Sequence, residues 1–446
     1  MSIVVSNMIG IGIFTMPAFF AGDLGTPSLA IGIWVVGAFM ALVGALCYSE
    51  LGINFPRSGG EYVYLSEAWG PTWGFVDGWV TFFAGFSAPI AVAALAISAY
   101  LAYFFPLLSP DQPVEPILSV GFVAIRLGGA QLVACGVVIA FTLLNILNVS
   151  HVSRLQNYLT GAKLLVLLAF LILGFTVGDG DWGHFTQSMT RTSELPLGSQ
   201  FAVSLVFIYL GYSGWNAAVY VAEEIRDPVR VLPRALLGGT LVVTVFFIAL
   251  NCLYIYANPL EKIAGNLAVG ANASAALFGP QTAGIFAAAM AASLLATVNA
   301  MCLIGPRVYY AMAQNRAFLP AAAKVHPRWQ SPWVAVMAQG TCCCLLIVTG
   351  TFESLAYYIG FMLNLFSALA VLALFKFRKK PDWKQIPWVS FAYPLIPSIY
   401  VGVNFLIFTY FASNQLEQAA WALLTVLAGA LVFHFTMSRA GATSQK

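Results

Sequence analysis

The sequence predicts an all-α polytopic membrane protein with twelve transmembrane helices, on the basis of its composition, the length of its apolar stretches and the placement of its charges. Of the 446 residues, 60% are hydrophobic and 8% are charged, and the mean hydropathy is +0.85. A soluble domain is about half apolar and about a quarter charged. The chain therefore lacks the polar residues that a water-facing surface needs.

Twelve apolar stretches reach or approach the length of about 20 residues that a helix needs to cross a bilayer. Polar, Pro- and Gly-rich segments separate them, and none of these segments is long enough for a soluble domain. The two longest spans are expected to tilt or to extend past the lipid. The expected spans are 2–22, 28–54, 72–106, 130–148, 157–177, 200–222, 233–257, 279–313, 332–350, 354–377, 388–411 and 417–438.

The basic residues predict the orientation of these spans. An even number of spans places both termini on the same side of the membrane. If that side is the cytoplasm, then of the 20 Lys and Arg residues only Arg126, Arg191 and Lys262 lie in external loops, and Lys163 lies inside a span. Cytoplasmic loops carry an excess of Lys and Arg. We therefore expect a multi-pass protein of a bacterial inner membrane with both termini in the cytoplasm.

Two spans contain paired glycines, about two hundred residues apart. Gly10 and Gly12 lie in the first span, and Gly211 and Gly214 lie in the sixth. Glycine permits an unwound backbone, which is tolerated within a membrane where it lines a cavity or is buried in protein. Gly-interrupted spans at matching places in two halves indicate the binding site of a transporter. The alternative is that the glycines only allow close helix packing.

Several motifs resemble those of the amino acid–polyamine–organocation permeases, in particular the L-type and related bacterial branch. The similarity begins with Gly10-Ile-Gly-Ile-Phe14 and extends from Ser2 to about Arg378. The other motifs that carry it are Asn54-Phe-Pro-Arg-Ser-Gly-Gly-Glu-Tyr-Val-Tyr64, Gln156-Asn-Tyr-Leu-Thr-Gly-Ala-Lys163, Gly214-Trp-Asn with Glu223-Glu224-Ile-Arg-Asp-Pro228, and Arg307-Val-Tyr-Tyr-Ala-Met-Ala313 with Val325-His-Pro-Arg328.

This resemblance implies a five-plus-five inverted repeat, a leucine-transporter-like fold, with two extra helices. The first repeat would comprise residues 1–178, the second 200–377, and the extra helices 388–438. It also implies alternating access and sodium-independent exchange or proton-linked uptake of amino acids. Lys163 would occupy the place where related sodium-driven transporters bind a cation, either as a fixed charge or as a group that releases a proton during the cycle. The alternative is that its side chain extends to the cytosolic membrane interface.

The same resemblance assigns a substrate site to the two unwound segments. The backbone amides of Ile11 and Gly12 would hold the substrate carboxylate. The carbonyls of Met8, Leu210 and Ser213 would hold its α-amine.

Two further site residues follow from departures from the family pattern. The position of the usual aromatic gate is Leu210, so Tyr209 or Tyr212 is expected to substitute for it. In the eighth span, Asn299 is the best candidate for a polar contact. The loop around 107–129 has no cysteine, so we expect no disulfide-linked heavy chain of the kind that animal members have.

The acidic residues predict a neutral cargo. Glu50 and Asp77 lie near the cytosolic ends of their spans, where such residues are usually interfacial or paired, and no acid falls at mid-height. A cationic side chain buried in the membrane usually needs a nearby acid. We therefore expect neutral L-amino acids as substrates, with a polyamine or cationic amino acid antiporter as the alternative.

Other function classes fit less well. A membrane-embedded enzyme needs acids, bases or metal ligands at mid-membrane, and the sequence offers almost none, so we expect no enzyme, no cofactor and no metal site. The seven cysteines lie in apolar stretches and are interpreted as packing residues. No nucleic-acid partner is expected; the partners are the lipid bilayer and the substrate. A sensor with a permease fold stays open.

Overall fold

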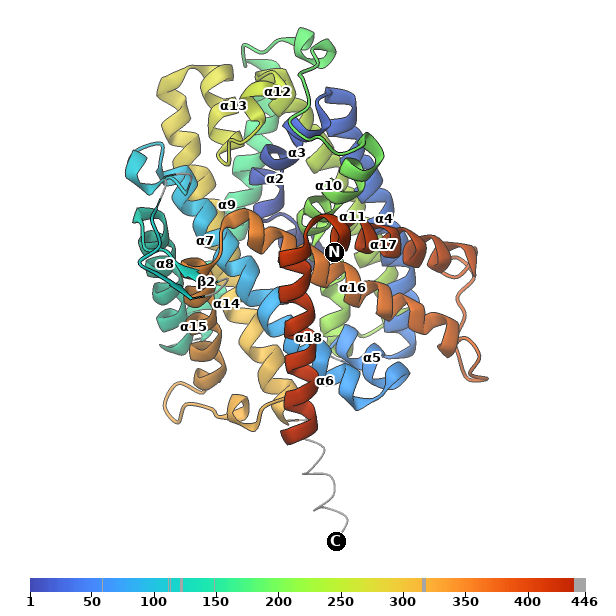
Figure 1. Ribbon diagram of the computed structural model, residues 1–446. Helices are drawn as coiled ribbons and strands as arrows, with labels where there is room; N and C mark the ends of the chain where they lie inside the picture. Colours follow the sequence, from blue (N-terminus) through green and yellow to red (C-terminus); the bar gives the residue numbers. More distant parts are fainter. Residues whose placement is uncertain are drawn as a thin grey trace.

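Helices form most of the molecule (Figure 1). The computed structural model describes residues 1–57, 59–110, 112, 114–120, 123–147, 149–314 and 318–436. In Figure 1, α5 lies at one end of the bundle and α12 and α13 lie at the other. We call the first of these ends the α5 end.

The first five predicted spans correspond to helices in the N-terminal part of the chain. The first span is divided into three helices, and the third contains a π-helical turn. The elements are α1 (Ser2–Met8), α2 (Ile11–Thr15), α3 (Pro17–Leu24), α4 (Pro27–Asn54), α5 (Glu61–Trp69), α6 (Pro71–Val80), the π-helix η1 (Thr81–Ser87), α7 (Ala88–Leu101), the 3₁₀ turn η2 (Pro106–Leu108), α8 (Gly129–Leu147) and α9 (Val149–Thr176).

The remaining spans follow in the same manner. The sixth span is divided into a helix and a 3₁₀ segment. The elements are the 3₁₀ turn η3 (Trp182–Thr186), α10 (Leu197–Tyr212), the 3₁₀ segment η4 (Ala217–Glu224), α11 (Pro228–Ala257), α12 (Leu260–Ile263), α13 (Val269–Phe278), α14 (Pro280–Gln314), the 3₁₀ turn η5 (Pro320–Ala323), α15 (Trp333–Thr349), α16 (Phe352–Phe377), α17 (Leu395–Asn414) and α18 (Leu416–Thr436).

Among the described residues, nine helices are long and apolar enough to cross a membrane. The shorter apolar helices α10 and α15 and the divided first span account for the other three predicted spans. The predicted class, an all-α polytopic membrane protein, is confirmed. Some boundaries differ from the expected spans: α9 begins at Val149 rather than at 157 and α11 at Pro228 rather than at 233. The helix α17 begins at Leu395 rather than at 388, because turns and a bend occupy residues 387–394 and Pro394 precedes the helix.

One short antiparallel hairpin lies in the loop between α7 and α8. Its strands are β1 (Leu118–Val120) and β2 (Val123–Ile125), and Ser119 is paired with Ala124. Two strands of three residues are too short to give a periodic pattern in the sequence, and the hairpin was therefore not predicted.

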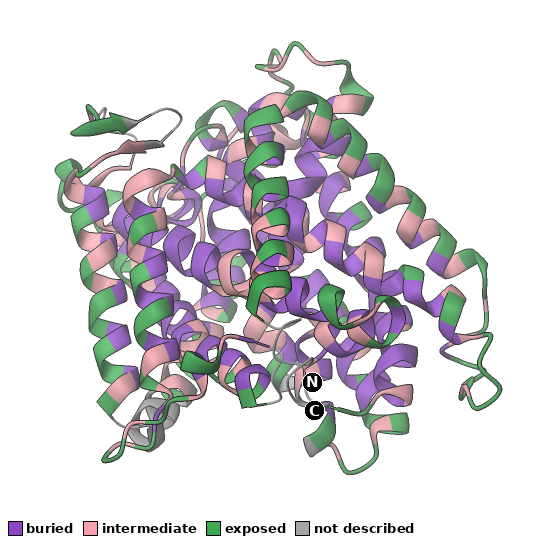
Figure 2. Ribbon diagram, turned by 60° about the horizontal axis from the view of Figure 1, so that its bottom comes forward, coloured by how far each residue is buried: buried purple, intermediate pink, exposed green. Residues whose placement is uncertain are grey.

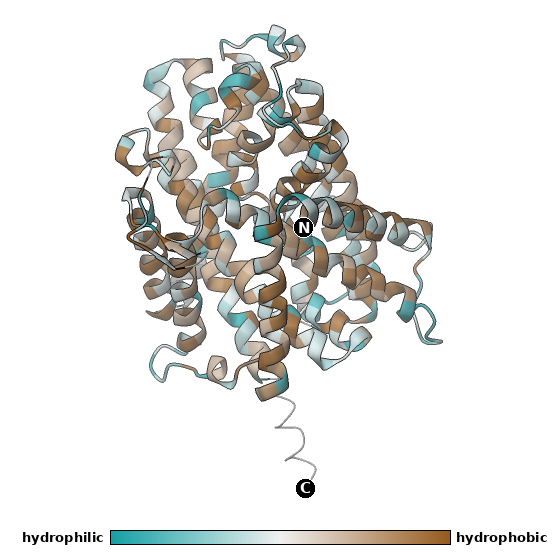
Figure 3. Cartoon of the chain, viewed as in Figure 1, coloured by the Kyte–Doolittle hydropathy of each residue, from teal (hydrophilic) through white to brown (hydrophobic). Residues whose placement is uncertain are grey.

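The outward faces of the bundle are apolar, as a lipid environment requires. Figure 2 shows buried residues through the interior and exposed residues along the outer helices. Figure 3 shows that these outer helices are largely hydrophobic. Leu165 and Ile285 are each 70% exposed, and Phe405 is 66% exposed. Exposed apolar surface of this extent marks contact with a nonpolar partner, and here that partner is the bilayer.

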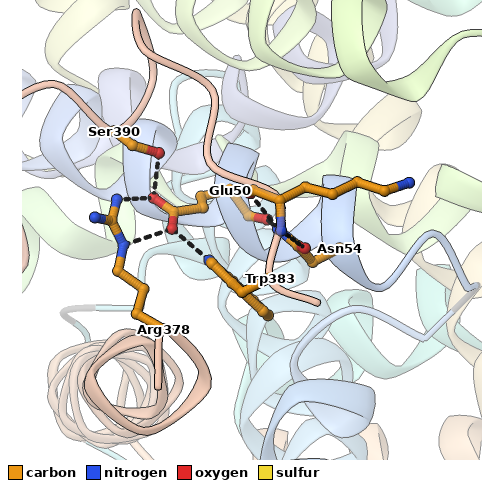
Figure 4. Close-up of polar contacts among 6 residues, drawn as sticks. Glu50, Asn54, Arg378, Trp383 and Ser390 are labelled. Carbon is orange, nitrogen blue, oxygen red and sulfur yellow. Dashed lines mark hydrogen bonds and ion pairs between the residues drawn. The ribbon is translucent and has the colours of Figure 1, made fainter. Parts of the chain in front are cut away.

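A buried ion pair joins α4 to the end of α16 at the α5 end (Figure 4). The Glu50 carboxylate accepts hydrogen bonds from Arg378 Nε and Nη2 at 2.7 and 2.6 Å, and from Trp383 Nε1 and Ser390 Oγ, both at 2.7 Å. The two charged side chains are 5% and 8% exposed. Four charge-assisted bonds satisfy the buried carboxylate, and Glu50 is therefore paired, as predicted.

A second contact attaches the loop between α16 and α17 to α4. Asn54, one turn after Glu50, donates from Nδ2 to the Lys384 carbonyl at 3.0 Å and accepts from the Lys384 amide at 2.8 Å. The guanidinium of Arg378 also lies 3.9 Å from the centre of the Tyr393 ring. The segment between α16 and α17 is therefore attached to α4 through side chains of both elements (Figure 4).

We expect Arg378→Ala to lower the apparent melting temperature of the purified protein strongly. Removal of one partner leaves the Glu50 charge buried, which costs about 3–5 kcal/mol. The matched control is Arg57→Ala, because Arg57 pairs with Glu67 at 3.3 Å on the surface, where the side chains are 68% and 37% exposed. An exposed pair contributes about 0–1 kcal/mol. Equal losses in the two variants would contradict this account of the buried pair.

Candidate functional site

Both glycine-containing spans are interrupted inside the bundle. In the first, α1 ends at Met8 and α2 begins at Ile11, so that Ile9 and Gly10 form the break. In the sixth, α10 ends at Tyr212 and η4 begins at Ala217. Gly214 lies in this second break with φ +94°, a conformation that residues with a Cβ rarely adopt.

Gly12 and Gly211 are helical rather than unwound. They lie in α2 and α10, and a Cβ built on Gly12 would overlap the Cα of Gly211. Their role in this structure is therefore the close approach of the two helices, which was the alternative reading of the glycine pairs. Gly10 differs, because a Cβ there would have its nearest neighbour, Thr297 Cγ2, at an ordinary 3.5 Å.

Lys163 of α9 binds the end of α1. Its Nζ donates to the carbonyl oxygens of Ile9 at 2.5 Å and Ser6 at 3.4 Å. The side chain is 2% exposed, so the ammonium points into the bundle and not toward the membrane interface. The last carbonyls of a helix lack partners within the helix and carry partial negative charge, which explains why a cation lies there.

Asn299 lies in a chain of polar side chains. It accepts from Asn145 Nδ2 at 3.4 Å and donates to Gln156 Oε1 at 2.9 Å, and Gln156 donates to Thr160 at 3.1 Å. The hydroxyl of Ser6 donates to Thr160 at 3.5 Å. This chain connects α8, α14, α9 and α1. Because Asn299 is fully buried and bonded within it, the residue does not reach the cavity described next.

A cavity of about 460 Å³ extends from the second break to the α5 end. Its volume is within the range of small-molecule sites, about 300–1,000 Å³. Its walls come from α1, α5, α6, η1, α7, α10, the second break, η4, α14 and α16. Of the predicted site residues, Tyr209, Ser213 and Gly214 line it.

The other predicted site residues lie outside the cavity lining. Met8, Ile11 and Leu210 are at most 5% exposed, and Gly12 is also buried. Ile11 and Gly12 are the first two residues of α2, where amides precede the hydrogen-bond ladder of the helix. The Met8 carbonyl accepts from Gly10 N at 2.8 Å, and the Leu210 carbonyl accepts from Ser213 N at 3.1 Å.

The two tyrosines expected near the gate have different environments. Tyr209 lines the cavity. Tyr212 is 2% exposed, donates from its hydroxyl to the Trp34 carbonyl at 3.1 Å, and packs against Trp34 and Phe247. Tyr209 is thus the one of the two that a ligand in this cavity can contact.

Charged groups on the cavity wall were missed by the sequence analysis. Glu61, Asp77 and Arg307 all line the cavity. Asp77 was expected to be interfacial or paired, but the residue is 3% exposed and its carboxylate has no hydrogen bond or ion pair within the described part of the chain. Its isolation was visible in the sequence, since it is the only charged residue between Pro71 and Leu101.

Two glycines position Glu61 at the start of α5. Gly59 and Gly60 have φ angles of 125° and 55°, and such a turn favours glycine. Glu61 Oε1 accepts from Tyr48 Oη at 2.5 Å and from Asn216 Nδ2 at 3.0 Å. Burial raises the pKa of the Glu61 carboxyl, and these two hydrogen bonds act in the opposite direction.

Helices broken inside a membrane bundle, beside an internal cavity, are the architecture of a secondary transporter. A family model described as amino acid permease matches residues 1–433, and the chain belongs to this family.

Three relatives are similar over most of their length. The human large neutral amino acids transporter small subunit 2 is 30% identical over 88% of this chain and 71% of its own. The serine/threonine exchanger SteT of Bacillus subtilis is 26% identical over 97% and 94%. The mouse b(0,+)-type amino acid transporter 1 is 28% identical over 97% and 85%.

We expect Gly12→Ala to destabilise the protein, because the new methyl group would push α2 and α10 apart; overpacking of this kind costs about 1–3 kcal/mol. Gly10→Ala should be tolerated, because a methyl group there makes an ordinary contact. The melting temperature and the monodisperse yield of the purified variants measure the difference. A Gly12→Ala protein as stable as Gly10→Ala would contradict the close helix contact.

Proposed function

We propose that the protein is a sodium-independent transporter of neutral L-amino acids that works by alternating access. One observation carries the sodium independence: the Lys163 ammonium occupies the carbonyl oxygens of Ser6 and Ile9. Carbonyl oxygens freed by an unwound helix are the ligands that sodium-coupled transporters offer to the ion. Here a covalently held cation already fills that place.

The substrate would bind at the two breaks. The amides of Ile11 and Gly12 are proposed to hold its carboxylate, the carbonyls of Met8, Leu210 and Ser213 its α-amine, and Tyr209 to close over it. Asn299 would affect the substrate site indirectly, through the chain of hydrogen-bonded side chains that ends at Ser6.

The proposed inverted repeats, 1–178 and 200–377, each begin with one broken span, so that movement of one repeat against the other would open the site to either side. The helices in 388–438 would lie outside this repeat.

The α5 end is proposed to face the cytoplasm of a bacterial cell, with both chain termini on that side. Arg57, Lys376, Arg378 and Lys384 all lie in or beside elements of this end, in agreement with the positive-inside rule. The cavity, which extends toward α5, would then represent an inward-facing state.

We further propose that the chain works without a disulfide-linked heavy chain and without a cofactor or catalytic activity. All seven cysteines are free, and each lies within a helix, so the loop between α7 and α8 offers no thiol to a partner. Transport requires only binding and conformational change. The Bacillus relative is named as an exchanger, and exchange is the coupling that we favour here.

The test is uptake of labelled amino acids by the protein reconstituted in liposomes preloaded with unlabelled substrate. We expect alanine, leucine and serine to compete better than arginine and lysine, and replacement of sodium by choline to leave the rate unchanged. Binding without counterflow would indicate a sensor. Stronger competition by arginine or lysine would favour the cationic antiporter.

Lys163→Ala should abolish transport with little loss of folded protein, because the carbonyls of Ser6 and Ile9 would lose the cation that organises the first break. Lys262→Ala, at an exposed position of the short helix α12, is the matched control and should transport normally. Wild-type rates in Lys163→Ala, or a strict sodium requirement in the parent protein, would refute the role of this lysine.

A further inference from the structure

The cavity on the proposed transport path carries two carboxylates that form no ion pair with any described residue. Asp77 and Glu61 line the same cavity, and they lie close enough for their charges to interact. Both are at most 6% exposed. The ion pairs between described residues include neither of them. An unpaired buried carboxylate is costly, and within a membrane protein such a residue usually marks a ligand or ion path.

Each acid has free acceptor capacity toward the cavity. Both hydrogen bonds to Glu61 end on Oε1, and Oε2 has no hydrogen-bond partner among the described residues. Neither carboxylate oxygen of Asp77 has a hydrogen-bond partner among the described residues. Tyr220 also lines the cavity and lies within electrostatic reach of both acids. Carboxylate oxygens next to an aromatic ring are suitable partners for an ammonium group.

Arg307 adds the opposite charge to the same cavity. Its side chain lines the wall from α14 and forms no ion pair with either acid. Two carboxylates and one guanidinium without ion pairs among the described residues are complementary to a zwitterion, because the guanidinium can bind a carboxylate in a bidentate manner. Glu61, Asp77 and Arg307 line the cavity from α5, α6 and α14, whereas Tyr209 and Ser213 line it from α10 and the second break.

We propose that Asp77 and Glu61 form a second amino-acid site, an ammonium subsite between the central site and the cytoplasm, with Arg307 as the partner of the substrate carboxylate. This inference rests on the proposed function and extends it. A substrate that leaves the breaks exchanges its contacts with backbone groups for contacts with these side chains before it reaches water. A substrate that enters from the cytoplasm meets the same site first.

The first test compares the two sides of the membrane. In liposomes with determined protein orientation, Asp77→Asn should raise the KM for substrate on the cytoplasmic side roughly tenfold, as expected for loss of one charged hydrogen bond. The KM on the external side should stay unchanged. Glu67→Gln is the matched control, because Glu67 lies on α5 but outside the cavity lining, and both of its KM values should equal those of the parent.

The second test does not depend on transport. L-leucinamide keeps the ammonium group of leucine and lacks its carboxylate. It should raise the melting temperature of the purified parent protein, and Asp77→Asn should lose most of this shift. Glu61→Gln should lose part of it, which provides a second variant if Asp77→Asn does not fold.

The outcomes separate this proposal from the proposed function. A parent protein that transports amino acids, together with an Asp77→Asn variant of unchanged cytoplasmic KM and unchanged leucinamide shift, overturns the subsite. A parent that transports no amino acid but shows an Asp77-dependent leucinamide shift overturns the proposed function and keeps the ammonium site. If Asp77→Asn loses only the response to a pH gradient, the residue is a proton site and the subsite is overturned.

Discussion

The structure depends on the requirement that backbone groups freed by a broken helix find partners inside the bilayer. An unsatisfied carbonyl or amide in a nonpolar medium costs several kcal/mol. Lys163 meets this requirement for the carbonyls of Ser6 and Ile9, and internal turns meet it for Met8 and Leu210. The breaks can therefore exist without a bound ion, and the polar chain from Asn145 to Ser6 supports the same region from the neighbouring helices.

The glycine pairs show how one residue type serves two purposes within a few positions. Gly10 and Gly214 lie where the helical ladder is interrupted, while Gly12 and Gly211 let two helices touch. The contact between α2 and α10 fixes the two breaks relative to each other. A site assembled from two separate segments needs such a fixed relation, because its binding groups must be held in position before the ligand arrives.

Much of the fold could be predicted from the sequence, because the composition and the length of the apolar stretches indicate directly that the protein is surrounded by lipid. The breaks followed from glycine, and the place of Lys163 from its isolation in an apolar span and from the family resemblance. The position of Asn299 and the unpaired state of Asp77 did not follow, because both depend on which way a helix faces. The partners of Glu50 lie more than three hundred residues away in the chain, and spacing within one helix contains no signal for them.

The π-helix η1 has a consequence for the register of the third span. Seven residues, Thr81–Ser87, are wound more loosely than the helices before and after them, as if one residue had been added to a regular helix. One residue turns an α-helix by about 100°. Because of this insertion, the direction in which Asp77 of α6 points around the helix axis differs from the direction that a regular helix continuing into α7 would give it. Loss of a single residue from Thr81–Ser87 would rotate the carboxylate away from the cavity by about a quarter of a turn, with no change in the chemistry of any side chain.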